Sequence, residues 1–380
     1  MEQRKGYTTG TCAQAAAKAA MEVLLTGDLV KETLVTIPSG EVLHLPVSDV
    51  TAQYADEEDV LPVSASCAIR KDAGDDPDVT DGVLVYAQVR KIDAPGVHLA
   101  GGEGIGHVTK PGLEVSVGEP AINRVPREMI LKEVADACEE AGYVGGIEIT
   151  ISIPGGEELA KKTFNPNLGI EGGLSILGTS GVVEPMSEQA LLDTIRLDIQ
   201  VKLAEGRHYI IAAPGNYGLD FLRETYGISK EETVKCSNYI GPLIDMAGEL
   251  GAKGLLLAGH IGKLVKVSGG IMNTHSKWAD CRMELLAAAA IRAGIGGNVA
   301  EEMLDCISTD DALSRCTEEE RERLMDVLMD EIEAHLSSRA AGELTVGAII
   351  FSNVYGILGE TKNAADLIRR YKEDREKENS

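Results

Sequence analysis

The 380-residue chain is poor in aromatic residues and in positive charge, and both shortages exclude classes of partner. Aromatic residues make up 4% of the sequence, with a single tryptophan at Trp278, and the formal net charge is −25 at pH 7. A protein that binds nucleic acid usually presents a basic surface, and one that binds single strands adds aromatic rings for base stacking. Attraction to anionic membrane surfaces also needs a basic face. We therefore expect no nucleic-acid partner and no membrane partner.

Paired cysteines and long apolar runs are also missing. The seven cysteines are odd in number and none follow the Cys-x-x-Cys spacing, so the sequence predicts neither a disulfide framework nor a structural zinc site. No apolar run reaches the roughly 20 residues that span a bilayer, and no signal peptide follows the first residues. These absences predict a cytoplasmic protein, in which we expect Cys236 and Cys281 to be buried small residues.

The first half of the chain mixes helical and strand patterns without regular alternation. Helices are expected over residues 12–25, which are rich in alanine, and over residues 126–141, whose apolar residues share one face. Residues 82–89 and 146–153 are rich in β-branched residues and predict strands. This order predicts an α+β sandwich domain for residues 1–186.

The second half has the rhythm of a parallel sheet. Short apolar segments at residues 208–213, 233–236 and 253–258 are each followed by a helical pattern. Residues 345–352 are interpreted as the last strand. We therefore expect an α/β Rossmann-like domain with a mostly parallel sheet over residues 187–380.

Acidic residues concentrate late in the chain. Thirteen Asp and Glu stand against three Arg between Glu301 and His335, which predicts a solvated helical region over residues 301–336. Thr317 followed by Glu320 is the pattern of a capping box, so a helix should begin there. The charged tail, residues 369–380, is expected to fray.

Loops of the first half combine glycine with hydroxyl groups or lysine. Residues 6–12 lead into the first helix, and their threonines suit either an anion site or a simple N-cap. The aspartates after Lys71 do not have the spacing of an EF-hand loop, and a solvated acidic turn is the simpler interpretation. Glycine-rich segments beside Lys110 and Lys161 permit close backbone approach to a ligand. The residues that we expect to contact an anionic ligand here are Thr8, Thr9, Thr11, Lys71, Lys110 and Lys161.

In the second half, two glycine-containing loops follow predicted parallel strands. They are residues 215–218 and 259–262, at the edge where α/β sheets bind small molecules, and neither is a GxGxxG fingerprint. Residues 259–282 carry four basic residues against one aspartate. In an acidic chain, this basic stretch favours a substrate with several carboxylates or phosphates over chance clustering. The residues expected to contact that substrate are Lys263, Lys266, Asn273 and Lys277.

The order of these segments resembles the CbiD family over about residues 6–280. The resemblance implies methylation of carbon 1 of cobalt-precorrin-5B, giving cobalt-precorrin-6A, in anaerobic cobalamin biosynthesis. It also implies S-adenosylmethionine as methyl donor, with cobalt present only as part of the substrate. The segments that carry the resemblance include Gly6–Cys12, Lys71–Asp78, Phe164–Pro166, Gly178–Pro185, Pro214–Gly218, Lys235–Asn238, Gly259–Lys263 and Gly269–Ser276.

The resemblance gives these loops chemical roles. A corrinoid precursor is fringed by carboxylates, so the anion-binding residues become substrate contacts. His260 and His275 are candidates for positioning or proton handling, because methyl transfer depends more on alignment than on a strong base. Neither has a third partner at ligand spacing, so no metal site is predicted. The methyl donor is expected at Gly215, Asn216, Tyr217, Gly218, Ser237, Asn238 and Gly259.

Two other classes of function compete with this interpretation. One is a non-enzymatic carrier that binds the corrinoid and delivers it. The other is a phosphotransferase or dehydrogenase, against which the absence of a Walker A segment and of GxGxxG counts. The sequence leaves open whether the protein forms a homo-oligomer.

Overall fold

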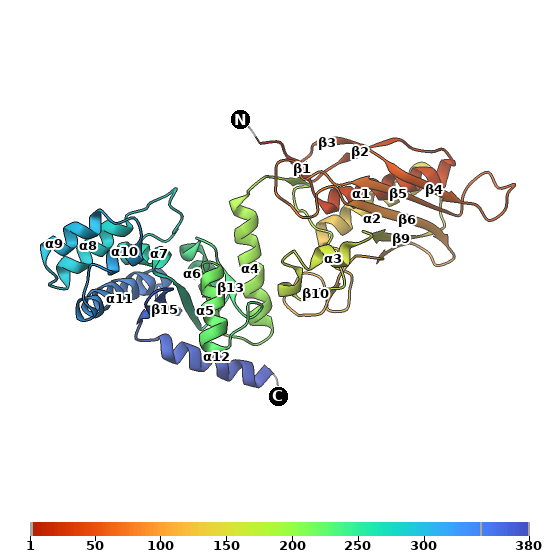
Figure 1. Cartoon of the computed structure of the whole chain (residues 1–380). Coiled ribbons are helices and arrows are strands. Elements are labelled where there is room, and N and C mark those ends of the chain that lie inside the picture. The colour runs from red at the N-terminus through yellow and green to blue at the C-terminus, as the bar shows by residue number, and fades with distance from the viewer. Residues whose placement is uncertain (1–2, 343, 379–380) are drawn as a thin grey trace. The chain divides into compact units, whose positions relative to one another are not determined.

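The chain forms two compact units, residues 1–188 and 189–380, each with its own sheet (Figure 1). The computed structural model describes residues 3–342 and 344–378. The division lies close to residue 186, where the secondary-structure pattern of the sequence changes.

The first unit is built on a five-stranded sheet with helices packed against it. The strands have the order β4-β5-β6-β9-β7, and all neighbours are antiparallel except β7 and β9. Alternate residues of β6 and β9 are buried, as expected for strands that turn one face to the core. The elements are β4 (Ser48–Gln53), β5 (Ser64–Arg70), β6 (Leu84–Ile92), β7 (Val97–Gly101), β9 (Gly146–Ser152), α1 (Thr9–Thr26) and α2 (Arg124–Glu140).

Helix α1 is the central element of this unit and contacts β5, β6 and α2. Its alanines are fully buried, and their small side chains let the helix lie close to its neighbours. Thr8 caps its beginning by accepting a hydrogen bond from Thr11 N, and Gly27 ends it in the left-handed region at φ 80°. The alanine-rich helix predicted from sequence is confirmed.

Short elements complete the first unit. These are one hairpin, two further pairs of short strands and two short helices. They are β2 (Glu32–Thr36) with β3 (Val42–Pro46), β1 (Gly6–Tyr7) with β11 (Val182–Val183), β8 (His107–Val108) with β10 (Ile170–Glu171), α3 (Gly156–Ala160) and η1 (Asn165–Leu168).

The second unit confirms the predicted mostly parallel sheet. Its five strands have the order β13-β12-β14-β15-β16, of which the first four are parallel and β16 is antiparallel to β15. The chain leaves β12 toward β13 on one side and returns to β14 on the other, so the strand order reverses between β12 and β14. The strands are β12 (Tyr209–Ala213), β13 (Val234–Lys235), β14 (Gly254–His260), β15 (Thr345–Ser352) and β16 (Gly356–Glu360).

Helices cover both faces of this sheet. Ile210 and Leu255 belong to the core that contains α6 and α11, whereas Ile211 and Leu256 belong to the core that contains α5 and α12. Consecutive residues of one strand therefore face opposite layers, which explains why these strands read as continuous apolar runs. The helices are α4 (Glu188–Ala204), α5 (Asn216–Tyr226), α6 (Ile240–Glu249), α7 (Ile261–Leu264), η2 (Val265–Gly269), α8 (Arg282–Arg292), α9 (Gly297–Leu304), α10 (Thr309–Leu313), α11 (Glu318–Ala340) and α12 (Ala364–Glu378).

The acidic region is helical, as predicted, and its capping box is present. The Thr317 hydroxyl accepts from Glu320 N at 3.3 Å, and the Glu320 carboxylate accepts from Thr317 N at 2.9 Å. Within the described part of the chain, no helix is both long enough and apolar enough to cross a bilayer.

Two expectations for the C-terminal region are wrong. Residues 345–352 are not the last strand, because the chain turns back after β15 and adds β16 to the sheet. The tail does not fray within the described residues, since it forms α12 as far as Glu378. Although the tail is highly charged, α12 has one apolar face, formed by Leu367, Ile368 and Tyr371, which is buried against the sheet.

We predict that Leu367→Ala destabilises the second unit by about 2–5 kcal/mol, because it removes a fully buried side chain from the core beneath α12. Urea denaturation would measure the free energy of unfolding, and amide hydrogen exchange would follow α12. Lys372→Ala, at an exposed position of the same helix, should change stability by less than about 0.5 kcal/mol. Equal stability of the two variants would show that α12 does not contribute to the fold.

Candidate functional site

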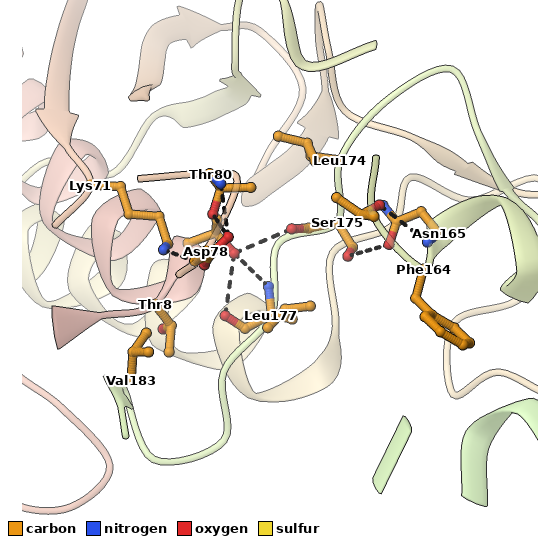
Figure 2. A pocket seen from close by; sticks show the side chains of 12 residues that line it. Thr8, Lys71, Asp78, Thr80, Phe164, Asn165, Leu174, Ser175, Leu177 and Val183 are labelled. Carbon is orange, nitrogen blue, oxygen red and sulfur yellow. Dashed lines mark hydrogen bonds and ion pairs between the residues drawn. The ribbon is translucent and has the colours of Figure 1, made fainter. Parts of the chain in front are cut away.

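A pocket of about 230 Å³ lies in the first unit (Figure 2). Thr8 and Thr9 reach it from the start of α1, Lys71 from the end of β5, and Asn165 from η1. Phe164 and three aliphatic side chains supply apolar walls. The pocket therefore gathers segments from across the first unit, and it places three of the predicted substrate residues together. The apolar residues are Phe164, Leu174, Leu177 and Val183.

A buried ion pair lies at the wall of this pocket. The side chain of Lys71 is 2% exposed and its ammonium donates to Asp78 Oδ2 at 2.7 Å, as Figure 2 shows. The other oxygen of Asp78 accepts from Thr80 N at 2.8 Å and from Thr80 Oγ1 at 2.7 Å. Burial raises the pKa of Asp78, but the hydrogen bonds from Lys71 and Thr80 outweigh it, so the pKa lies below its ordinary value. Asp78 is therefore a carboxylate at neutral pH.

The threonines of the 6–12 segment act as a cap and as pocket residues at once. Thr8 caps α1 and lines the pocket, while Thr9 Oγ1 donates to Ser175 O at 3.2 Å and accepts from Leu177 N at 3.0 Å. Thr11 lies behind them, fully buried, and donates to Gly181 O at 2.7 Å. In this structure Thr11 fixes the loop, whereas Thr8 and Thr9 face the pocket.

Five polar residues that line the pocket were not among the predicted contacts: Asp78, Thr80, Thr163, Asn165 and Ser175. Ser175 Oγ donates to Asn165 Oδ1 at 3.3 Å, and Asn165 Nδ2 donates to Gly173 O at 3.2 Å. Asn165 belongs to a segment that supported the family resemblance, which was the available indication of its importance. Ser175 had no such indication, because only the fold brings it beside Asn165.

The other two lysines predicted in this half do not line the pocket. Lys161 is exposed and pairs with Glu158 one helical turn earlier, at 2.5 Å. The aliphatic part of Lys110 packs over Gly169, where a Cβ atom would lie 2.3 Å from Lys110 Cγ. Substrate contact by either lysine stays a prediction.

In the second unit, the predicted glycine loops meet at the carboxyl ends of β12 and β14. The Lys263 ammonium donates to Pro214 O at 2.7 Å and so ties the two loops together. A Cβ atom on Gly218 would lie 2.7 Å from Ala258 O, and one on Gly259 would lie 2.9 Å from Pro214 Cγ. Only glycine permits this spacing, which brings Asn216 and Tyr217 at the start of α5 to the reversal point of the sheet.

His260 ends β14 at this same edge. Its Nδ1 accepts from Gly262 N at 3.0 Å and caps α7, and its ring lies 6.0 Å from that of Tyr217 and 5.8 Å from that of Phe351. Burial lowers the pKa of His260, with the Asp310 carboxylate opposing that effect. The imidazole is therefore neutral at pH 7, and because Nδ1 is an acceptor, its hydrogen is on Nε2.

Asp310 and Ser352 complete this edge and were missed by the sequence analysis. Asp310 Oδ2 lies 3.9 Å from His260 Nε2, and Asp310 Oδ1 accepts from Ser352 Oγ at 2.6 Å. They belong to α10 and β15, far from His260 in sequence. Asp310 was counted as part of a solvated acidic region, so nothing in its sequence context separated it from its neighbours.

The basic loop after η2 is held by a buried lysine. Lys266 is 2% exposed and donates to Thr274 O at 3.1 Å and to Ala279 O at 2.8 Å. Thr274 Oγ1 also donates to Asn238 Oδ1 at 3.2 Å, which links the loop to the residues after β13. In this structure Lys266 therefore holds the loop that presents other polar groups.

The remaining predicted residues of the second unit lie on or beside this loop. His275 is exposed and its Nδ1 accepts from Lys277 N at 3.0 Å, while the Lys277 ammonium lies 5.6 Å from the centre of the Trp278 ring. Asn273 Oδ1 accepts from His275 N at 3.1 Å. Ser237 has a left-handed backbone, with φ 53°. His275 thus lies on an exposed loop, whereas His260 lies partly buried at the end of β14.

The cysteines are unpaired, and one of the two predicted burials is wrong. Cys236 is fully buried, and burial raises its pKa to about 12. Cys281 is exposed, because it precedes α8 in a left-handed turn with φ 49°. In the part of the chain that the structure describes, no three His, Cys, Asp or Glu side chains are grouped to hold a metal ion.

Comparison with known proteins identifies the family. Residues 1–185 match the CbiD family model, and residues 273–362 match the model of the CbiD C-terminal domain. A "Cobalt-precorrin-5B C(1)-methyltransferase" of Ruminiclostridium cellulolyticum is 44% identical over 370 residues, which cover 96% of this chain and 94% of that protein. A protein of the same name from Moorella thermoacetica is 45% identical over 376 residues, covering 98% of this chain and 99% of that protein.

The structure of a cobalamin biosynthesis protein (CbiD) from Archaeoglobus fulgidus is also similar, with 29% sequence identity and a TM-score of 0.39. The match covers 74% of this chain and 84% of that one. The chain is an enzyme, a methyltransferase of cobalamin biosynthesis. It belongs to the CbiD family, and the resemblance seen in the sequence is confirmed.

We predict that Lys71→Met raises the pKa of Asp78 from its lowered value, because the hydrogen bonds from Thr80 alone then oppose burial. In the wild type the lowered pKa stabilises the fold above the ordinary pKa of an aspartate, and this contribution is lost as pH falls through the lowered value. The variant should therefore be less stable than wild type by about 3–5 kcal/mol at pH 7, with a smaller difference in acid. Carboxyl NMR titration and urea denaturation at several pH values would measure both effects.

Lys162→Met is the control, since Lys162 is exposed in the same unit. It should leave the pKa of Asp78 and the stability of the unit unchanged. An Asp78 titration that is identical in wild type and Lys71→Met would contradict the proposed coupling.

Proposed function

We propose that this enzyme transfers a methyl group from S-adenosylmethionine to carbon 1 of cobalt-precorrin-5B and gives cobalt-precorrin-6A, in anaerobic cobalamin biosynthesis. The observation that carries the proposal is the near full-length identity to proteins of that name, 44% with the Ruminiclostridium protein. Cobalt enters only as part of the substrate. The seven unpaired cysteines support a reducing compartment, the cytoplasm, as the place of the reaction.

We place the donor in the second unit, interpreted as a Rossmann-like domain, at the reversal point between β12 and β14. Ligands of open α/β sheets bind outside the carboxyl ends of the strands at such a point. The edge has groups that fit a donor with a carboxylate, an amine and an adenosine. Gly215 has no side chain that could cap α5, so the first N–H groups of the helix can donate to an anionic group of the donor. Tyr217 is 66% exposed. When bound, the donor supplies a methyl group on a sulfonium.

The glycines at this edge determine how near a ligand can come. Gly215 leaves backbone accessible where a side chain would stand, and Gly218 lets α5 approach β14. Gly259 is buried against Pro214. The ammonium of Lys263 lies next to Gly215, since a Cβ atom there would be 3.6 Å from Lys263 Nζ. The residues that we propose to hold the donor are Gly215, Asn216, Tyr217, Gly218, Ser237, Asn238 and Gly259.

We propose that the pocket of the first unit takes one carboxylate arm of the corrinoid ring. Its volume, about 230 Å³, suits a side arm and not the whole macrocycle. Lys71 provides a buried positive charge, and its ammonium has three hydrogens, of which Asp78 accepts one. The apolar walls suit the methylene groups of an acetate or propionate arm. Further ring contacts stay proposals at Thr8, Thr9, Thr11, Lys110, Lys161, Lys263, Lys266, Asn273 and Lys277.

The geometry of the histidines favours positioning over proton abstraction. A group that removes a proton needs a free nitrogen lone pair, and in the neutral His260 that lone pair is engaged by Gly262 N at 3.0 Å. His275 Nδ1 is likewise engaged by Lys277 N. Both residues present Nε2–H as a donor, and alignment of donor and ring carbon is the main requirement of methyl transfer.

The reaction itself is tested by incubating the purified full-length protein with cobalt-precorrin-5B and S-adenosylmethionine without oxygen. We predict a product heavier by one methyl group, with S-adenosylhomocysteine formed in equal amount, both measured by mass spectrometry. NMR of a product made with carbon-13 methyl donor would place the group at carbon 1. Ring binding without mass change would instead support the corrinoid carrier.

Because the donor and the ring are assigned to different units, we predict that each of two variants weakens the binding of a different ligand. Gly218→Ala should weaken S-adenosylhomocysteine binding by about tenfold or more, because its Cβ atom forces α5 away from Ala258 O. Lys71→Met should weaken ring binding by about tenfold, the loss of one charge-assisted contact, without changing donor affinity. Isothermal titration calorimetry would measure all four affinities.

Gly248→Ala is the matched glycine control, since nothing lies within 4 Å of a Cβ atom at that position. It should bind both ligands as the wild type does. A Gly218→Ala protein with unchanged donor affinity would refute the placement at the β12–β14 edge, and a Lys71→Met protein with unchanged ring affinity would refute the pocket assignment.

A further inference from the structure

His260 carries a hydrogen-bond donor and Asp310 an acceptor, and the two groups face each other at a distance too long for a hydrogen bond. The separation of His260 Nε2 and Asp310 Oδ2 is 3.9 Å, which exceeds the length of an N–H···O hydrogen bond. The side chains are 20% and 28% exposed, so both reach solvent from a largely enclosed position. The pair therefore leaves one N–H and one carboxylate oxygen available to a third group.

The hydrogen of His260 is fixed on Nε2 by the backbone. Nδ1 accepts from Gly262 N at 3.0 Å, and this bond also caps α7. The charged group facing the imidazole is Asp310 on α10, while Tyr217 on α5 and Phe351 on β15 present rings. His260 is therefore a donor at this edge, and it cannot accept a hydrogen bond through Nε2 in its neutral form.

Asp310 is oriented from its other oxygen. Ser352 Oγ donates to Asp310 Oδ1 at 2.6 Å, and Ser352 Oγ itself accepts from Val354 N at 2.9 Å. The serine hydrogen is thus directed at Asp310, which leaves Oδ2 toward His260. The start of α10 also packs beside α7, since a Cβ atom on Gly262 would lie 3.8 Å from Thr309 Oγ1.

Only a group that both accepts and donates fits this pair. An ammonium would meet the N–H of His260 donor to donor, and a carboxylate would meet the charge of Asp310. A hydroxyl accepts from Nε2–H and donates to Oδ2, and at normal hydrogen-bond lengths its oxygen can bridge atoms 3.9 Å apart. The hydroxyl group is therefore the chemistry that the pair selects.

We propose that His260 and Asp310 together bind one ribose hydroxyl of the adenosyl donor. The inference rests on the proposed function, which puts the donor at this edge, and adds Asp310 as a binding residue with Ser352 as its positioning residue. The ring of Tyr217, on the donor loop, lies 6.0 Å from that of His260, so the pair is adjacent to the loop. The ribose carries the hydroxyl groups nearest to the transferred methyl.

The test is a cycle of ligands and variants, measured by isothermal titration calorimetry on the full-length protein. The ligands are S-adenosylhomocysteine and its 2′-deoxy and 3′-deoxy analogues. Wild type should lose about tenfold in affinity for one of the two analogues, the loss expected for one hydrogen bond to a charged group. Asp310→Asn should bind S-adenosylhomocysteine about tenfold more weakly and no longer distinguish that analogue.

Asp311→Asn is the matched control, because Asp311 follows Asp310 on α10 but pairs with Arg315 at 3.1 Å. It should behave as wild type with all three ligands. Equal wild-type affinity for all three overturns the inference even if Asp310→Asn fails to fold, and it leaves the proposed function intact. Absence of any adenosyl binding by wild type overturns the donor placement and this inference together.

Discussion

The second unit depends on one close contact. Helix α5, which follows β12, lies directly against the end of β14. The chain leaves these neighbouring strands in opposite directions, toward β13 and toward β15, and ligands of open α/β sheets bind at such a point. Glycine at position 218 keeps α5 in contact with Ala258 O, and Lys263 joins the two loops through Pro214 O. His260 takes its orientation from the turn that follows. A side chain at position 218 would therefore push α5 away from the ends of β12 and β14, since its Cβ atom would meet Ala213 and Ala258.

The two units stabilise buried lysines in different ways, with different electrostatic consequences. Lys71 is paired with Asp78, so the charge of the first-unit pocket is nearly balanced. Lys263 and Lys266 donate instead to the carbonyl oxygens of Pro214, Thr274 and Ala279, and the nearest carboxylate to Lys266, that of Asp280, lies 3.8 Å away. A carbonyl satisfies the hydrogen bonds of an ammonium without cancelling its charge. The ammonium groups of Lys263 and Lys266 therefore concentrate positive charge locally at these loops, in a chain whose net charge is −25.

Sequence patterns predicted the elements whose signals are local. The alanines of α1, the apolar strands of the parallel sheet and the capping box at Thr317 each act within a few residues, and each was found. The edge loops were also predictable, because parallel strands place their carboxyl ends together. α12 was misinterpreted, since its charges outnumber the three apolar residues that bury its face. Asn165 with Ser175, and Asp310 with Ser352, were beyond such reasoning, because only tertiary packing joins them.

The two histidines show how far a residue type alone can be interpreted. The sequence treats His260 and His275 alike, and locally they are alike, since each Nδ1 accepts from the backbone N–H two residues later. In its neutral form, each imidazole ring therefore carries its hydrogen on Nε2. The difference lies in what Nε2 meets: His275 is exposed on a loop, whereas His260 is half-buried and faces a carboxylate fixed by a serine. A backbone bond sets what a histidine can donate, and its neighbours from other elements decide which ligand can use that donor.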